Sequence, residues 1–169
     1  AVRLGNLWGY IGKDGSYIIN PKFEDDINGE MDDKVFSEGL AAVRTDDLMA
    51  SVLKSLIEKN PDLPVDKIDD VIIGCVNQAG EDNRNVARMA LLLAGIPMNV
   101  PGETVNRLCA SGMSAVVQAM RAIKSGEGDL FIAGGVEGMS RAPYVLSKSE
   151  NGFATDQKMY DSSFGWRFV

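Results

Sequence analysis

Apolar and polar positions divide the 169-residue chain into two stretches of different character. Up to about residue 40, short aromatic and β-branched runs alternate with turn residues. The runs at 7–12 and 17–20 flank a turn centred on Asp14 and Gly15, which predicts a β-hairpin whose second strand ends at Pro21. The N-terminal stretch is therefore expected to be all-β.

From Thr45 onward, helical periodicity alternates with continuous apolar runs. Thr45 is predicted to cap a helix that ends before Pro61. The apolar runs at 71–76 and 130–135 are typical of strands buried on both faces of a mostly parallel sheet. This order predicts an α/β layered domain. The predicted core face of the first helix is Leu48, Val52, Leu53, Leu56 and Ile57.

Two further helices are predicted between these strands. Asn85 is placed to cap a helix over 86–94, which Gly95 closes. The next helix follows Cys109 and ends at Gly126. Its predicted core stripe is Met113, Val116, Val117, Met120 and Ile123.

Cys109 stands where an extended run, 104–108, gives way to that helix. A thiol at a helix start meets the positive end of the helix dipole, which favours the nucleophilic thiolate. The three residues that follow, 110–112, are small and allow a substrate carbonyl to approach the sulfur. Cys109 is therefore the candidate nucleophile, whereas Cys75, at the end of a buried strand, is expected to be structural. The chain contains no histidine, the usual activating partner of such a thiol.

Composition narrows the possible partners. A formal net charge of −7 argues against nucleic acid as the main partner. No apolar run approaches the length of a membrane span, and residues 1–5 do not resemble a signal peptide. Two cysteines without a dense spacing pattern predict free thiols and a cytoplasmic location, and no metal site is expected.

The N-terminal stretch resembles a WG repeat. The resemblance rests on Trp8-Gly9, the Asp-Gly turn, the strand ending in a proline, and Phe-Ser-Glu-Gly-Leu-Ala at 36–41. It implies a small β module without chemistry. Such repeats usually occur in arrays, because one repeat cannot bury its own apolar face.

Three blocks resemble the thiolase family, in the family's order, over about residues 39–169. The blocks are Asn-Gln-Ala-Gly at 77–80 with Asn-Val-Ala-Arg at 85–88, Asn-Arg-Leu-Cys-Ala-Ser-Gly-Met at 106–113, and Gly-Gly-Val-Glu-Gly-Met-Ser-Arg-Ala-Pro at 134–143. Residues 78–85 and 165–169 look closest to the β-ketoadipyl-CoA thiolase branch. The second block is the family's nucleophile motif.

The resemblance implies a thiolase-like layered α/β/α half and a two-step acyl transfer between CoA thioesters. Cys109 maps onto the nucleophile that forms the acyl thioester, and its backbone N–H maps onto an oxyanion donor. The resemblance implies coenzyme A as a substrate rather than a covalently bound cofactor, and a homodimer or homotetramer.

The chain also departs from the family. The family's first strand, its activating histidine and its second catalytic cysteine have no counterpart, so the chain reads as an N-terminal half. The predicted organisation is a WG-like β segment over 1–38 and a truncated thiolase half over 39–169. Residues 39–44 fit both patterns, which makes them a plausible splice point between unrelated sequences. We expect the isolated chain to be inactive.

Two alternatives stay open. The WG-like segment could be a binding module fused to a degenerate thiolase fragment. The chain could also self-associate through an exposed Met113, Val117 and Met120 face.

Several side chains keep two interpretations each. Glu137 orders active-site loops or has a solvated or capping role, and the glycines at 134–135 cradle a phosphate or permit tight packing. Met113 and Met139 border an acyl pocket or belong to the core. Arg88 and Arg141 are expected to be loop anchors or subunit contacts rather than ligands of CoA phosphates.

Overall fold

The computed structural model describes residues 2–4, 7–11, 14, 16–24, 36–37, 40–41, 44–149, 152, 155 and 157–163. Part of the stretch that resembles both families, and residues 165–169, on which the closer resemblance partly rests, lie outside the described residues. No helix among the described residues is long and apolar enough to cross a membrane.

The N-terminal strands form antiparallel pairs. Three of them make a sheet in the order β1-β2-β3, and the short β4 and β5 pair with each other. β3 continues through Pro21, so it is longer than expected. Proline is tolerated there because β3 is the last strand of its sheet in this order. The bounds are β1 Val2–Leu4, β2 Leu7–Ile11, β3 Tyr17–Glu24, β4 Phe36–Ser37 and β5 Leu40–Ala41.

The α/β part is built on a parallel sheet in the order β7-β6-β8, which confirms the predicted parallel arrangement. β6 (Asp70–Gly74) is the central strand, and β7 (Gly102–Val105) and β8 (Phe131–Gly135) flank it. The last residue of β6, Gly74, is opposite Val105 on one side and Gly135 on the other. All three strands therefore end at the same edge of the sheet.

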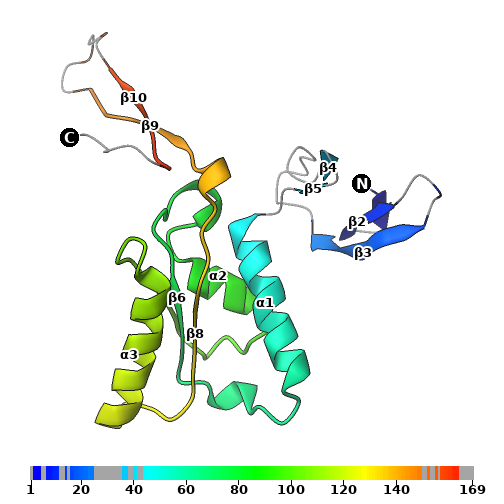
Figure 1. Cartoon of the computed structure of the whole chain (residues 1–169), viewed down its shortest axis with the longest axis vertical. Helices are drawn as coiled ribbons and strands as arrows, with labels where there is room; N and C mark the ends of the chain where they lie inside the picture. Colours follow the sequence, from blue (N-terminus) through cyan, green and yellow to red (C-terminus); the bar gives the residue numbers. More distant parts are fainter. Residues whose placement is uncertain are drawn as a thin grey trace.

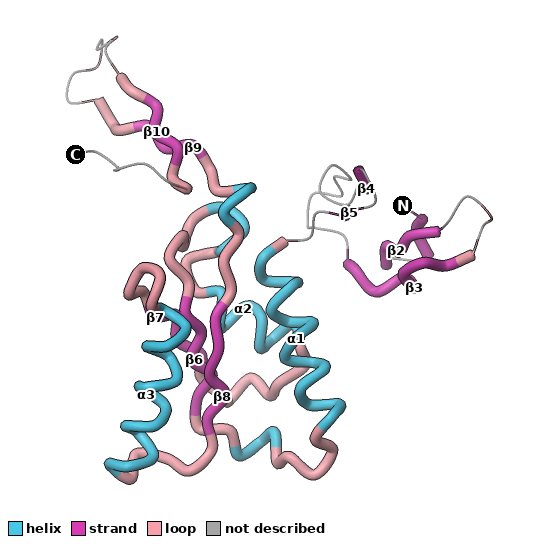
Figure 2. The backbone as a smooth tube through the Cα atoms, in the orientation of Figure 1, coloured by secondary structure: helices cyan, strands magenta, loops and turns pink. Residues whose placement is uncertain are grey.

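Helices cover both faces of this sheet, as Figures 1 and 2 show. Val71 and Ile73 of β6 pack in a core with α1 (Thr45–Lys59) and α2 (Val86–Leu93). Ile72 points the opposite way and packs in a second core with Ala115 and Ala119 of α3 (Ser111–Ser125). Successive side chains of β6 thus point into opposite cores, as expected for a strand buried on both faces. The helices and the sheet together form an α/β/α layering.

Short elements connect and extend these layers. β9 and β10 pair as an antiparallel hairpin beyond the carboxyl edge of the sheet (Figure 1). The bounds are η2 Val65–Lys67, η3 Gly80–Asp82, η4 Met139–Arg141, β9 Tyr144–Leu146 and β10 Met159–Asp161.

The start of α1 and part of its core face differ from the prediction, whereas the predicted Leu53 and Ile57 do belong to the core side. Arg44 occupies the N-cap position, and Thr45 is the first helical residue, with a buried side chain. The core face is the stripe of Met49 and Leu53, with Ile57 packed against it. The predicted Leu48, Val52 and Leu56 are exposed. Both stripes have the four-residue spacing of a helix, and packing against α2 and the sheet selects the first.

The predicted core stripe of α3 is also wrong. Small residues, Ala115 and Ala119, face the sheet, because α3 packs closely on β6 and β8. The larger apolar side chains of the helix are exposed: Met113, Val116, Met120 and Ile123. The helix boundaries are as expected, since Gly126 is the C-cap with φ 78°, and the side chain of Asn85 caps α2 by accepting from the Arg88 N–H.

We predict that Leu53→Ala and Leu56→Ala, made in the same helix, differ strongly in stability. Leu53 is 1% exposed, and its truncation leaves a core cavity costing about 2–5 kcal/mol of unfolding free energy. Leu56 is 40% exposed, and its truncation should cost about 1 kcal/mol or less. Urea unfolding followed by circular dichroism measures both. Equal losses would show that the assigned face of α1 is incorrect.

Candidate active site

Glycines bring the N-terminus of α3 against the carboxyl ends of β6 and β8. A Cβ added at Gly74 would overlap the backbone of Ser111. A Cβ added at Gly135 would lie 3.2 Å from Cα of Gly112 and 3.3 Å from the Gly74 carbonyl oxygen. Of the two interpretations of the Gly-Gly pair, close packing is therefore the one the structure supports.

The turn that leads into α3 is held by the side chain of Asn106. Its Nδ2 donates to the Val76 carbonyl oxygen at 3.1 Å, and its Oδ1 accepts from the Leu108 N–H at 2.9 Å. Leu108 has φ 50°, in the left-handed region that non-glycine residues rarely occupy. Asn106 thus ties a strained turn to the loop after β6.

Ser111, the first residue of α3, closes the same turn from the other side. Its hydroxyl donates to the Leu108 carbonyl oxygen at 2.6 Å and accepts from the Arg107 N–H at 2.8 Å. The N–H groups of Ala110 and Ser111 also donate within the turn. None of the turn's hydrogen bonds among the described residues is donated by the N–H of Cys109.

Cys109 is exposed at the end of this turn, two residues before α3 begins. It lines a cavity of about 640 Å³ at the carboxyl edge of the sheet. Ligand sites of open parallel sheets occupy this position, and the volume suits a medium-sized ligand. The other lining residues include Gly74, Ser111, Gly112, Gly135, Glu137, Met139 and Ser162.

The two methionines in question have different environments. Met139 lines the cavity beside Cys109. Met113 is 72% exposed, so in the described part of the chain it neither lines the cavity nor belongs to the core.

Glu137 fixes the loop that follows β6. Its carboxylate accepts from the Val76 N–H at 2.7 Å and from the Asn77 N–H at 3.0 Å. Nδ2 of Asn77 in turn donates to the Ser162 hydroxyl at 3.4 Å. Glu137 therefore orders loops around the cavity, the first of its two sequence-based interpretations.

The arginines also anchor loops. Arg88 donates from Nη1 to the Val100 carbonyl oxygen at 2.6 Å and from Nη2 to that of Met98 at 3.0 Å. Arg141 forms an ion pair with Glu81. These contacts agree with the predicted anchoring roles.

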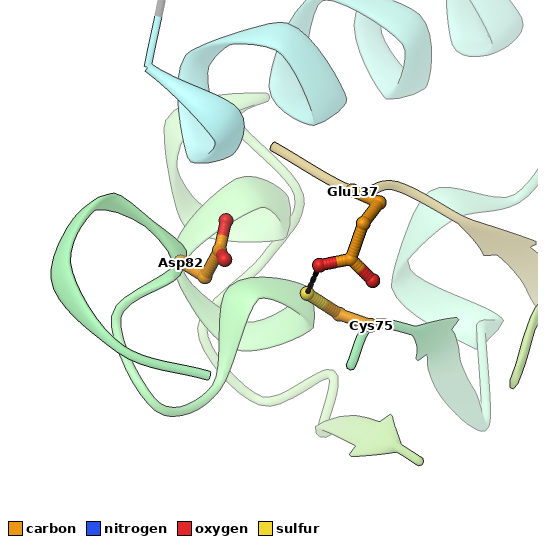
Figure 3. A group of neighbouring side chains, drawn as sticks. All are labelled: Cys75, Asp82 and Glu137. Atoms are coloured by element: carbon orange, nitrogen blue, oxygen red, sulfur yellow. Dashed lines mark hydrogen bonds between the residues drawn. The ribbon is translucent and has the colours of Figure 1, made fainter. Parts of the chain in front are cut away.

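Cys75, Asp82 and Glu137 form a second group next to the cavity (Figure 3), in which one donor atom of each lies within 4.8 Å of the others. Cys75 is 1% exposed. Burial, together with the negative charges of Asp82 and Glu137, raises the pKa of the Cys75 thiol to about 12. The buried, inert thiol agrees with the structural role expected from sequence.

Asp82 belongs to this group, but sequence reasoning did not single it out. Its side chain is buried, and burial raises the pKa of its carboxyl group, with further contributions from Glu137, Glu81 and Asp46. It lies among loop residues, Gly-Glu-Asp-Asn at 80–83, that look solvated in the sequence. The local sequence around Asp82 therefore gives no indication that its side chain is buried.

Comparison with known proteins assigns the family. The model of the family described as "Thiolase, N-terminal domain" matches residues 32–164, and that of "WG containing repeat" matches residues 8–48. The chain belongs to the thiolase family. Both models cover residues 32–48, the region that contains the predicted splice point.

The similar proteins include β-ketoadipyl-CoA thiolases. The chain is 62% identical to "Beta-ketoadipyl-CoA thiolase" of Pseudomonas knackmussii, over 79% of this chain and 33% of the relative. It is 58% identical to "3-oxoadipyl-CoA/3-oxo-5,6-dehydrosuberyl-CoA thiolase" of Escherichia coli, over the same shares. The chain thus spans about a third of the length of these relatives.

A solved structure supports the fold. The Bacillus anthracis acetyl-CoA acetyltransferase aligns with a TM-score of 0.63 and 35% sequence identity, over 70% of this chain and 30% of that chain. The thiolase resemblance, predicted from the three sequence blocks, and its branch, predicted from residues 78–85 and 165–169, are confirmed.

We predict that iodoacetamide modifies Cys109 well before Cys75 in the folded chain. Cys109 is exposed, whereas Cys75 is buried and has a pKa of about 12, so its thiolate is scarce at neutral pH. Peptide mass spectrometry after timed labelling gives both rates. Cys109→Ser should remove the fast phase, and denaturation should make both thiols react. Equal native rates would contradict the assigned burial.

We predict that Asp82→Asn stabilises the chain in EDTA buffer at pH 7. Because the folded-state pKa of Asp82 is raised above 3.8, the unfolded state loses its proton first as pH rises, and stability falls through that window. The gain from Asn should therefore shrink as pH falls toward about 4. The exposed Asp66→Asn is the charge-matched control. A gain independent of pH would refute this electrostatic origin.

Proposed function

We propose that this chain is the nucleophile-bearing half of an acyl-CoA C-acyltransferase and that Cys109 carries the acyl group. One observation supports this best. The exposed Cys109 thiol lies at the N-terminal end of α3, in a cavity at the carboxyl ends of β6 and β8. The thiolate is the nucleophilic form of a cysteine sulfur.

In the proposed reaction, Sγ of Cys109 attacks the carbonyl carbon of an acyl-CoA. The tetrahedral intermediate collapses, the carbon–leaving-group bond breaks, and an acyl thioester remains on the sulfur. With a 3-oxoacyl-CoA the leaving group is the enolate of acetyl-CoA, which takes a proton. The thiol of coenzyme A then attacks the acyl thioester, regenerates Cys109 and leaves as the shortened acyl-CoA.

The N–H of Cys109 is proposed as one oxyanion donor. It is not engaged in the hydrogen bonds of the described turn, so it is available to the developing negative charge on the carbonyl oxygen. Asn106 and Ser111 hold this N–H in place through their bonds to the turn.

The names of the relatives suggest the substrate. We propose 3-oxoadipyl-CoA as the acyl substrate, with coenzyme A as acyl acceptor, because the proteins with 58–62% identity are named as thiolases of that compound. A homodimer or homotetramer, a cytoplasmic location and a boundary between residues 38 and 39 stay predictions.

Turnover needs a general base, and these 169 residues contain no histidine that could serve as one. General-base assistance is worth about 10²–10⁴-fold in rate. We therefore propose that the chain tested alone accepts an acyl group on Cys109 but performs no multiple-turnover thiolysis.

A second candidate function is that of a binding module. The match of residues 8–48 to the WG repeat and the antiparallel β1-β2-β3 sheet favour it. Further WG repeats upstream in the gene would support this function, whereas a histidine-bearing thiolase half downstream would support acyl transfer.

We predict that incubation with acetyl-CoA adds one acetyl group to Cys109. Peptide mass spectrometry locates the thioester, and hydroxylamine should release it. Cys109→Ala should abolish the adduct, whereas Cys75→Ala should keep it. Acetylation of other residues only would exclude Cys109 as the acyl carrier. Sustained CoA-dependent cleavage of 3-oxoadipyl-CoA by this chain would contradict the missing base.

A further inference from the structure

Negative charge is concentrated around Asp82 without a matching buried cation among the described residues. The charges that raise its pKa are all carboxylates, those of Glu137, Glu81 and Asp46. The nearby arginines are engaged at the edges of this region. Arg141 pairs with Glu81, and Arg44 pairs with Asp46 and Asp47.

An unsatisfied oxygen lies inside the same region. Asp82 is 2% exposed, and its Oδ1 is buried without a hydrogen-bond partner among the described residues. A Cβ added at Gly138 would lie 3.6 Å from this oxygen, so Oδ1 faces the segment that follows Glu137. The Asp82 carboxylate has one hydrogen-bond partner in the described part of the chain, the Thr45 side chain, and the buried Oδ1 without a partner is destabilising.

We propose that Cys75, Asp82 and Glu137 form a binding site for a divalent transition-metal ion of the zinc type. One sulfur and two carboxylate oxygens suit an ion of intermediate softness better than Mg²⁺ or Ca²⁺, which prefer oxygen ligands only. Figure 3 shows the three side chains, which come from the residue after β6, from η3 and from the segment after β8.

The spacing allows a metal ion after a small contraction. The donor atoms lie within 4.8 Å of one another, whereas ligands of tetrahedral Zn²⁺ lie about 3.5 Å apart, given Zn–S and Zn–O distances of about 2.3 and 2.0 Å. Glu137 is exposed, but its carboxylate accepts from the Val76 and Asn77 N–H groups, so it has to shift within these two hydrogen bonds to approach the two buried groups. It also lines the Cys109 cavity, which leaves the fourth coordination position open to water on that side.

Binding is balanced by proton release. The Cys75 thiol loses its proton to solvent as the metal–sulfur bond forms. No oxidation state changes. The ion would replace the hydrogen that Cys75 shares with the Glu137 carboxylate and would bind one carboxylate oxygen of Asp82.

Cobalt(II) is the probe that tests the site, because thiolate coordination to cobalt produces charge-transfer absorption that carboxylates alone do not. The EDTA-treated, dialysed chain is titrated with CoCl₂. We expect this absorption to saturate at one ion per chain and to disappear when ZnCl₂ is added. Cys109→Ser should keep the absorption, and Cys75→Ser should lose it.

Asp82→Asn is the second variant, and it decides the outcome if Cys75→Ser does not fold by circular dichroism. It should weaken cobalt binding by about tenfold or more, whereas Asp66→Asn, an equal charge change at an exposed site, should not. The proposal is overturned if the chain shows no cobalt–thiolate absorption. It is also overturned if Cys109→Ser abolishes that absorption or Asp82→Asn leaves the affinity unchanged.

Discussion

The close approach of α3 to the ends of β6 and β8 is the constraint on which the candidate site depends. At Gly74, no side chain fits between the strand and the backbone of Ser111. On the neighbouring strand β8, Gly135 lies so close to Gly112 of α3 that a Cβ would barely fit between them. This packing places the N-terminus of α3 at the carboxyl edge of the parallel sheet. The N-terminal end of α3 and the ends of β6 and β8 therefore border the same cavity.

The strain of the Cys109 turn follows from this packing. The chain must leave β7, cross the end of β6 and enter α3 within six residues, and Leu108 takes a left-handed conformation to do so. Hydrogen bonds from Asn106 and Ser111 offset the cost of that conformation. The exposed Cys109 thiol consequently lines the cavity from a turn that these hydrogen bonds hold.

Much of this was predictable from sequence, and the failures have physical causes. The strand around residues 71–76, the Asn85 cap, the Gly126 C-cap and the position of Cys109 at a helix start each have a local signal. The buried faces of α1 and α3 have none, because apolar residues lie on more than one side of each helix. In α3 the large apolar side chains are exposed and small alanines face the sheet. The burial of Asp82 depends on residues distant in sequence, so no local pattern indicates it.

A crystal structure of the chain soaked with acetyl-CoA tests most directly whether this packing builds an acyl-transfer site. We expect an acetyl group bonded to Sγ of Cys109, with its carbonyl oxygen about 3 Å from the Cys109 nitrogen. The N-terminus of α3 should remain against Gly74 and Gly135. An acetyl group on a different residue, or one on Cys109 whose oxygen points away from that nitrogen, would contradict the account.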